Sequence, residues 1–176
     1  MIYVISDLHL NHNQPFIYEP RGFTNVHDMT ETLIDNYNEI ITDKDIVYIL
    51  GDCVLNSTPN EAVNYMCRLH GTKYLAIGNH DTEAKVTAYQ AARVFKDIQL
   101  GYRLKYKKAS FYLTHHPLLV ANASFERTYN IHGHDHSPIH YDPEQRFCYS
   151  ACVDSTHNSP ISLSQIYEDI KTCACW

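Results

Sequence analysis

The chain has 176 residues, which fits one domain or at most two very small ones, and we expect a single domain over residues 1–176. Its 44% hydrophobic and 19% charged residues, with only 6 Gly and 7 Pro, are typical of a globular protein and exclude collagen-like or disordered chains. The formal net charge of −6 argues against a protein that chiefly grips the backbone of long nucleic acids, because that task needs a basic face.

Two further features of the composition indicate where the chain works and with what chemistry. No run approaches the roughly 18 apolar residues of a membrane span, and the first residues, MIYVISD, bring in an acid before a signal-peptide core can form. We therefore expect a cytoplasmic protein with reduced thiols. The 12 His stand out against 14 Lys plus Arg, since imidazole is the commonest metal ligand and a frequent proton-transfer group.

In the first half of the chain, short apolar runs alternate with stretches of helical periodicity. Buried strands are expected at residues 2–6, 46–50 and 73–77. One helix is expected after Asn25 as N-cap, with an apolar face that ends at Ile41. A second should begin after Thr58 as N-cap and stop at Gly71. A third should run from Thr82 to about Arg93. The order is therefore strand, helix, strand, helix, strand, helix.

The second half reads mostly as β-structure. Strands are expected within residues 94–106, 110–114, 128–132 and 147–153. A last helix should begin at Leu163, because Ser162 and Gln165 form a capping box and Ile161 and Ile166 occupy the staple positions. These elements together predict an α/β sandwich with sheets inside and helices outside.

Asp, His and Asn residues follow five of the predicted strands. In α/β sheets, ligands bind outside the carboxyl ends of the strands, so these side chains should converge on one rim. They are Asp7, His9, Asp52, Asn79, His115, His134 and His136. Seven groups exceed the three or four that a single ion usually takes and suit two metal ions sharing a bridge.

The spacing of these residues supports a shared site. Asp7-x-His9 and His134-x-His136 each place two side chains on the same side of an extended chain. Glycines at 51, 78 and 133 let the backbone turn sharply beside the ligands. Imidazole, carboxylate and amide ligands without a thiolate favour Mn, Fe, Zn or a similar ion over Cu(I) or an iron–sulfur cluster.

Five motifs occur in a fixed order over residues 6–136: SDLH (6–9), GDC (51–53), GNHD (78–81), THHP (114–117) and GHDH (133–136). In this order they resemble the calcineurin-like metallophosphoesterase superfamily. The resemblance implies a four-layer α/β/β/α sandwich of mixed β-sheets flanked by helices. It also implies a phosphatase or phosphodiesterase that hydrolyses phosphate monoesters or diesters through a metal-bridging hydroxide. The modest length of the chain leaves little room for a cap domain, so we expect an open cleft and a small or flexible substrate, such as a nucleotide.

The resemblance also implies residue roles. The first ion would take Asp7, His9, Asp52 and His136, and the second would take Asp52, Asn79, His115 and His134. His80 would face the phosphate and protonate the leaving oxygen or stabilise the transition state. We expect two divalent ions, Mn²⁺ first, with Fe, Zn or Ni as alternatives. Asp81 either orients His80 or caps the following helix, and we favour the cap.

Other residues near the motifs have less specific signals. We favour His115 over His116 as the metal ligand, which leaves His116 for substrate or for orienting a ligand. His12, Arg21 and Arg127 are candidate substrate contacts, and a solvated loop residue is the alternative for each. Cys53 departs from the family, where Phe or Leu often follows GD, and we interpret it as a buried core residue.

The expected partner is a small phosphorylated substrate, with neither membrane nor long nucleic acid, and the oligomeric state stays open. A binding scaffold with a vestigial metal site and a nuclease for short single strands are the alternatives. Substrate choice should lie in residues 11–26 and 118–127. The Cys173-Ala-Cys175-Trp tail is either a soft-metal site or a frayed end.

Overall fold

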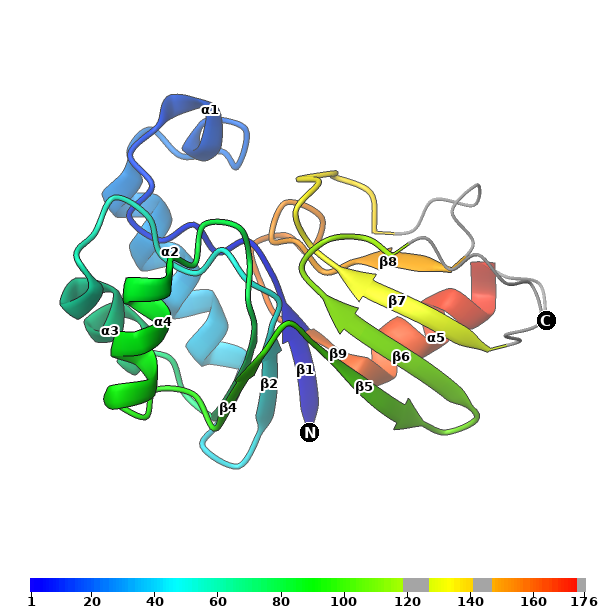
Figure 1. Cartoon of the computed structure of the whole chain (residues 1–176). Coiled ribbons are helices and arrows are strands. Elements are labelled where there is room, and N and C mark those ends of the chain that lie inside the picture. Colours follow the sequence, from blue (N-terminus) through cyan, green and yellow to red (C-terminus); the bar gives the residue numbers. More distant parts are fainter. Residues whose placement is uncertain (119–126, 141–146, 174–176) are drawn as a thin grey trace.

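A computed structural model of the chain describes residues 1–118, 127–140 and 147–173. Two mixed sheets form its centre (Figure 1), with the strand orders β4-β3-β2-β1-β9 and β5-β6-β7-β8. The first sheet contains β1 (Ile2–Ile5), β2 (Ile46–Ile49), β3 (Thr72–Ala76), β4 (Asp97–Gln99) and β9 (Ile161–Ser162). The second contains β5 (Gly101–Tyr106), β6 (Ala109–Thr114), β7 (Thr128–His132) and β8 (Cys148–Ser150). The expected α/β fold, with two mixed sheets flanked by helices, is confirmed.

Strands β1 to β4 run parallel, so their carboxyl ends meet at one edge of the first sheet. Val4 and Ile5 in β1 are fully buried, because helices cover one face of this sheet and the second sheet covers the other. In the second sheet, β6, β7 and β8 are also parallel, while β5 pairs antiparallel with β6. Each sheet therefore delivers several loops to the same side of the molecule.

Helices α2 (Val26–Ile40), α3 (Pro59–Cys67) and α4 (Glu83–Ala91) pack on the first sheet (Figure 1). Their predicted starts are confirmed: Asn25 accepts the amide N–H of Asp28, and Thr58 forms a reciprocal capping box with Glu61. Met29, Leu33 and Tyr37 of α2 lie in the core between helices and sheet. A short helix, α1 (Pro15–Tyr18), was not expected.

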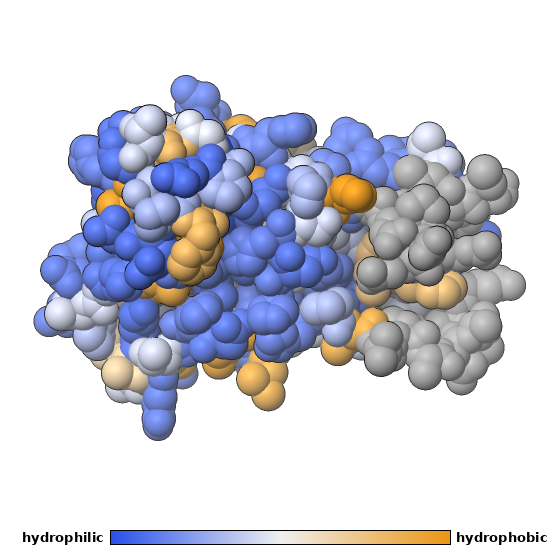
Figure 2. Space-filling view, turned by 90° about the horizontal axis from the view of Figure 1, so that it is seen from above, coloured by the Kyte–Doolittle hydropathy of each residue, from blue (hydrophilic) through white to orange (hydrophobic). Residues whose placement is uncertain are grey.

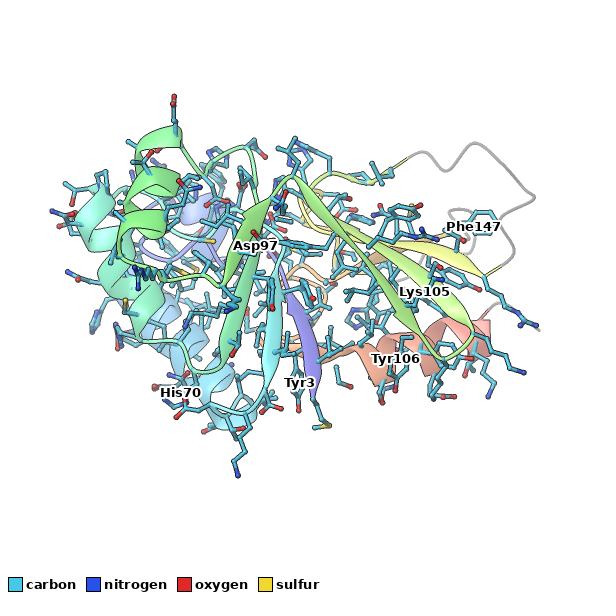
Figure 3. All side chains as sticks on the ribbon, turned by 60° about the horizontal axis from the view of Figure 1, so that its bottom comes forward. Tyr3, His70, Asp97, Lys105, Tyr106 and Phe147 are labelled. Carbon is cyan, nitrogen blue, oxygen red and sulfur yellow. The ribbon has the colours of Figure 1, made fainter. Side chains whose placement is uncertain are left out.

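Helix α5 (Leu163–Cys173) begins at the predicted residue and packs behind β6 and β7 (Figure 1). Leu163, Ile166 and Ile170 join a second core, which contains residues of both sheets. Tyr106 of β5, labelled in Figure 3, contacts Tyr167 of α5 with ring centroids 5.7 Å apart. The capping box is only half formed, because Ser162 Oγ accepts the Gln165 amide at 3.1 Å while the Gln165 side chain donates to Asp169.

Two expected strands differ in extent. The stretch 94–106 divides at Leu100 into β4, which extends the first sheet, and β5, which begins the second. The last predicted strand ends at Ser150 rather than at residue 153. Within the described ranges, no helix has the length and apolar content needed to cross a bilayer.

Candidate metal centre

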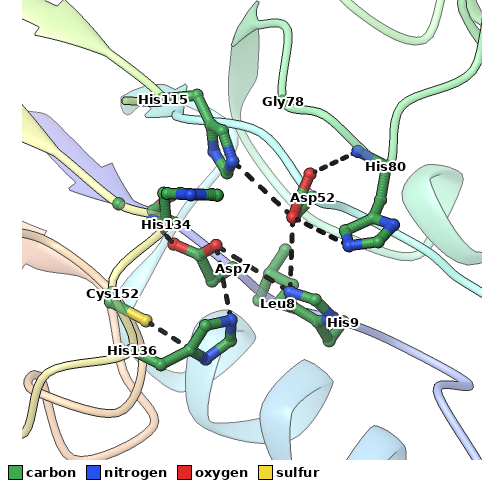
Figure 4. Close-up of polar contacts among 12 residues, drawn as sticks. Asp7, Leu8, His9, Asp52, Gly78, His80, His115, His134, His136 and Cys152 are labelled. Carbon is green, nitrogen blue, oxygen red and sulfur yellow. Dashed lines mark hydrogen bonds and ion pairs between the residues drawn. The ribbon is translucent and has the colours of Figure 1, made fainter. Parts of the chain in front are cut away.

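The seven predicted ligands come together where the loops of both sheets meet; Figure 4 labels six of them, and Asn79 contacts His115 and His134. β1 leads to Asp7 and His9, and the loops after β2 and β3 carry Asp52 and Asn79. The second sheet supplies His115 after β6, and His134 and His136 after β7. The convergence follows from the topology, because parallel strands end at a common edge.

The backbone at this site is not extended as the spacing suggested. Asp7 and His9 have φ of 57° and 48°, and Asp52, His134 and His136 have φ of 52°, 74° and 49°. Residues with a Cβ seldom adopt this left-handed conformation, which costs free energy and clusters at functional sites. The expectation that each Asp-x-His or His-x-His pair is aligned by an extended chain is therefore wrong; left-handed turns bring the side chains together.

The three glycines beside the ligands have two different roles. Gly51 has a φ of +91°, so it provides the sharp turn that was expected. Gly78 and Gly133 instead leave room for a carboxylate: a Cβ on Gly78 would meet the Asp52 carboxylate, and one on Gly133 would meet Asp7 Oδ2. Glycine is required at these two positions because a carboxylate packs against the backbone, not because the backbone is left-handed.

The first group of ligand atoms surrounds Asp7 Oδ1. This oxygen lies 3.8 Å from His9 Nε2 and 3.9 Å from His136 Nε2, and His9 Nε2 lies 3.5 Å from Asp52 Oδ2. Asp7 Oδ1 and His9 Nε2 are buried and have no hydrogen-bond partner in the described part of the chain. Buried polar atoms are nearly always paired, so two such atoms facing one another fit a cation held between them.

The electrostatics of this group also suit a cation. Burial alone would raise the pKa of Asp7, but the nearby His9 and Ser6 side chains lower it to about 2. Burial likewise opposes charge on His9, yet its contacts with Asp52 and Asp7 outweigh this and raise the His9 pKa. The pKa of Asp52 is also lowered, against its burial, by His9 and by the His80 amide. The carboxylates are thus ionised near neutral pH.

A second group adjoins the first through Asp52. His115 Nε2 lies 3.6 Å from Asp52 Oδ2 and 2.7 Å from Asn79 Oδ1, which is 3.0 Å from His134 Nδ1. His115 is buried with Nδ1 facing the Leu50 carbonyl at 2.8 Å, so Nε2 is turned toward the site. Donor atoms of His115, His116 and His134 also lie within 4.8 Å of one another. This geometry fits our preference for His115 as a ligand and places the exposed His116 beside it.

Asp154 is a site residue that sequence reasoning missed. Its Oδ2 lies 2.9 Å from His136 Nδ1 and 2.9 Å from Arg21 Nη2, and Arg21 Nε donates to Oδ1 at 3.0 Å. Arg21 also donates to the carbonyl oxygens of Asp7 and Leu8. Arg21 therefore lies buried under the ligand loop, which differs from the expected substrate contact and gives it the role of positioning Asp154 and that loop.

Asp81 also has a different role from the one expected. Thr82 is the N-cap of α4, whereas the buried Asp81 accepts backbone N–H groups of Asp52, Cys53 and Gly78 at 2.9, 3.2 and 3.0 Å. The predicted cap at Asp81 is therefore wrong, and this carboxylate ties two ligand loops together. Cys53 is fully buried in the first core, so the interpretation as a core residue is confirmed.

Of the remaining candidate residues, some lie beside the ligand cluster and one lies far from it. His80 is half exposed, with Nε2 3.9 Å from Asp52 Oδ2, and His12 Nδ1 lies 2.9 Å from His9 Nδ1. Arg127 precedes β7, at the end of that strand opposite the ligands, about 16 Å of extended chain away. The structure thus brings His80 and His12 to the ligand cluster but not Arg127. Residues 119–126 of the expected specificity loop, the Cys173 side chain and Cys175 lie outside the described residues.

Comparison with known proteins agrees with this geometry. The family model for calcineurin-like phosphoesterases matches residues 1–168. The uncharacterized protein MJ1445 of Methanocaldococcus jannaschii is 32% identical over 176 residues, which cover 97% of this chain and 91% of that protein.

Solved structures show the same fold. The protein of unknown function AQ665 from Aquifex aeolicus superposes with a TM-score of 0.70 at 24% identity, covering 96% of this chain and 98% of its own. An archaeal phosphodiesterase gives a TM-score of 0.50 at 17% identity, covering 85% of this chain and 81% of its own. Since the family match runs through every ligand loop and nearly to the last residue, this chain belongs to the calcineurin-like phosphoesterases.

Proposed function

We propose that the protein is a binuclear metal-dependent phosphoesterase that hydrolyses phosphate monoesters or diesters. The observation that carries the proposal is the pair of adjoining ligand groups that share Asp52, with the buried and unpartnered Asp7 Oδ1 and His9 Nε2 on one side. A vestigial scaffold does not need two buried polar atoms without partners, because each of them costs folding free energy.

Each of the two groups of residues would hold one divalent cation. The first position would use Asp7, His9, Asp52 and His136, and the second would use Asp52, Asn79, His115 and His134. Two such cations, when bound, lower the pKa of a water and stabilise negative charge on phosphoryl oxygens. The nitrogen and oxygen donors favour Mn²⁺, with Fe, Zn or Ni as alternatives. Cys152 lies on the far side of His136: its Sγ is 4.0 Å from His136 Nδ1 and donates to Asp154 Oδ2 at 2.9 Å, and burial raises the pKa of the thiol.

The chain's own residues fix the ligands and supply a proton donor. His115 Nδ1 donates to the Leu50 carbonyl and His136 Nδ1 to Asp154, so each presents Nε2 to the site. The His80 amide donates to Asp52 Oδ1 at 2.8 Å, which holds the half-exposed imidazole at the rim. From there, His80 can donate a proton to the leaving oxygen or a hydrogen bond to the phosphoryl group.

The test is hydrolysis of an aryl phosphate monoester and its diester with added Mn²⁺ and after chelation. We expect turnover that requires metal, and the preferred ester separates phosphatase from phosphodiesterase. Asp52→Ala should abolish turnover and lower metal content, whereas His80→Ala should lower kcat by about 10²–10⁴-fold and keep the metals.

The matched control is His70→Ala, since His70 lies before β3, at the end of the strand away from the site (Figure 3). This control should keep full activity. Full activity in Asp52→Ala, or no turnover by wild-type protein with both metals demonstrably bound, would refute the proposal.

A further inference from the structure

A cavity of about 560 Å³ opens directly beside the first ligand group. Its lining residues are His9, His12, Phe16, Ile17, Pro20, His80, His136 and Asp154. The lining has two parts: one side carries the candidate ligands and His80, and the other consists of Phe16, Ile17 and Pro20 in and after α1. The volume lies within the usual range of roughly 300–1,000 Å³ for small-molecule sites. A phosphoester at the ligands would therefore extend its organic group toward α1.

The α1 wall is apolar and fixed in place. Ile17 is buried in the first core, which anchors the short helix, while Phe16 beside it is 69% exposed. Figure 2 shows hydrophobic side chains over α1 within a mostly hydrophilic face. The Phe16 ring meets His12 edge-on, with centroids 5.9 Å apart and an interplanar angle of 84°. An exposed aromatic ring held at the rim of a polar site is typical of a surface for stacking a ligand ring.

His12 adds one polar group of defined character. His9 Nε2 faces the ligand group, so a His9 that binds a cation there carries its proton on Nδ1. That Nδ1 lies 2.9 Å from His12 Nδ1, so His12 Nδ1 accepts the hydrogen bond from His9. Since its Nδ1 is the acceptor, a neutral His12 carries its proton on Nε2. Beside α1, the cavity wall thus combines apolar and aromatic surface with the imidazole of His12.

We propose that this subsite, formed by Phe16, Ile17, Pro20 and His12, binds a planar aromatic ring on the alcohol of the phosphoester. The preferred substrates are then nucleotides or aryl-bearing phosphoesters rather than sugar or alkyl phosphates. The inference rests on the proposed function, because the subsite has a role only if the ester is held at the ligand groups. A flat ring suits the site better than an alkyl chain, since the wall offers an aromatic ring and an N–H donor rather than a deep apolar slot.

The experiment compares esters of primary alcohols, in pairs of which one member carries an aromatic ring and the other does not. Adenosine 5′-monophosphate is paired with ribose 5-phosphate, and phenethyl phosphate with n-butyl phosphate, each also as its methyl diester. With Mn²⁺ present, we expect kcat/KM to be about tenfold or more higher for the ring-bearing member of at least the nucleotide pair. A preference in both pairs indicates any aromatic ring, and a preference in the first pair alone indicates a nucleobase.

Phe16→Ala should reduce this preference about tenfold, mainly through a higher KM for the ester that carries the aromatic ring. Phe16→Tyr should preserve it, since a stacking surface remains. Ile40→Ala, which removes a partly exposed apolar side chain at the end of α2 away from the site, is the control. An unchanged preference in Phe16→Ala, or a higher rate for the alkyl ester, overturns the inference. Failure of every ester to turn over would instead count against the proposed function.

Discussion

Asp154 provides the sharpest test of how the site is held together. Its carboxylate joins His136 Nδ1 to Arg21 and so keeps His136 Nε2 facing Asp7 Oδ1, 3.9 Å away. Burial opposes ionisation, but the hydrogen bonds from His136 and Arg21 hold the Asp154 pKa well below its ordinary 3.8. Asp154→Asn preserves the shape of the side chain and removes both the charge and one acceptor oxygen.

The size of the effect follows from these contacts. Loss of a partner that orients a ligand typically costs about 10–100-fold in metal affinity, or about 1.4–2.7 kcal/mol. The loss of folding stability should stay below the roughly 3–5 kcal/mol of a broken, fully buried ion pair. Arg21 keeps its bonds to the carbonyl oxygens of Asp7 and Leu8, at 3.0 and 3.1 Å, and the Asp154 side chain is 15% exposed.

Calorimetric titration of metal-free protein with Mn²⁺ measures the two affinities. We expect the position that includes His136 to weaken about 10–100-fold and the other to stay unchanged, because Leu50 and Asn79 hold its histidines. Asp135→Asn is the control, since it makes the same change on an exposed neighbour of His136. Unchanged Mn²⁺ affinities in Asp154→Asn, or an equal loss of affinity in Asp135→Asn, would contradict the role assigned to Asp154.

Three further predictions concern packing and pH. Gly133→Ala would place a methyl group against the Asp7 carboxylate, so it should abolish metal binding in the titration and lower the free energy of unfolding by about 1–3 kcal/mol. Leu33→Ala empties a fully buried position on α2 and should cost about 2–5 kcal/mol in urea unfolding, whereas Ile40→Ala on the same helix should cost far less. The pKa of Glu61 is lowered from 4.5 by its hydrogen bonds with Thr58 at the cap of α3, so its contribution to stability is present above pH 4.5 and is lost as the pH falls through the lower folded pKa. Glu61→Gln should therefore make the free energy of unfolding fall less steeply in acid. An unchanged decline would contradict this.

The sequence predicts those elements whose signals are local. The side chains of Asn25 and Thr58 make the expected cap hydrogen bonds, and α5 begins at Leu163 as its cap and staple residues indicate. Besides α1, the features it misses depend on distant partners. β9 has only two residues and exists because they pair with Tyr3 and Val4 of β1. The break at Leu100 is likewise set by which sheet each half joins rather than by any local signal.

In the site, too, residues with local sequence signals could be predicted and residues that depend on distant partners could not. The seven candidate ligands could be named from the sequence because they follow strand ends in recognisable motifs, and the structure brings these side chains together. Asp154 could not, because its partner Arg21 lies 133 positions away and its segment is brought to the site by pairing with distant residues, such as Cys152 with Ser6 and Ala151 with His132. Asp81 was misread since a residue just before a helix has a strong local signal as a cap, while its bonds to the amides of Asp52 and Cys53 in the preceding ligand loop are non-local.

The left-handed ligand residues explain why apolar residues separate the polar ones in SDLHL. Asp7 and His9 adopt a conformation that costs free energy, and the fully buried Leu8 and Leu10 offset it by packing in the first core. The amides of Asp7 and His9 donate to the carbonyl oxygens of Gly51 and Asp52, so the strained loop is also fixed to the next ligand loop. The core therefore does more than stabilise the fold, since its packing energy holds the ligands at positions that their own backbone preferences disfavour.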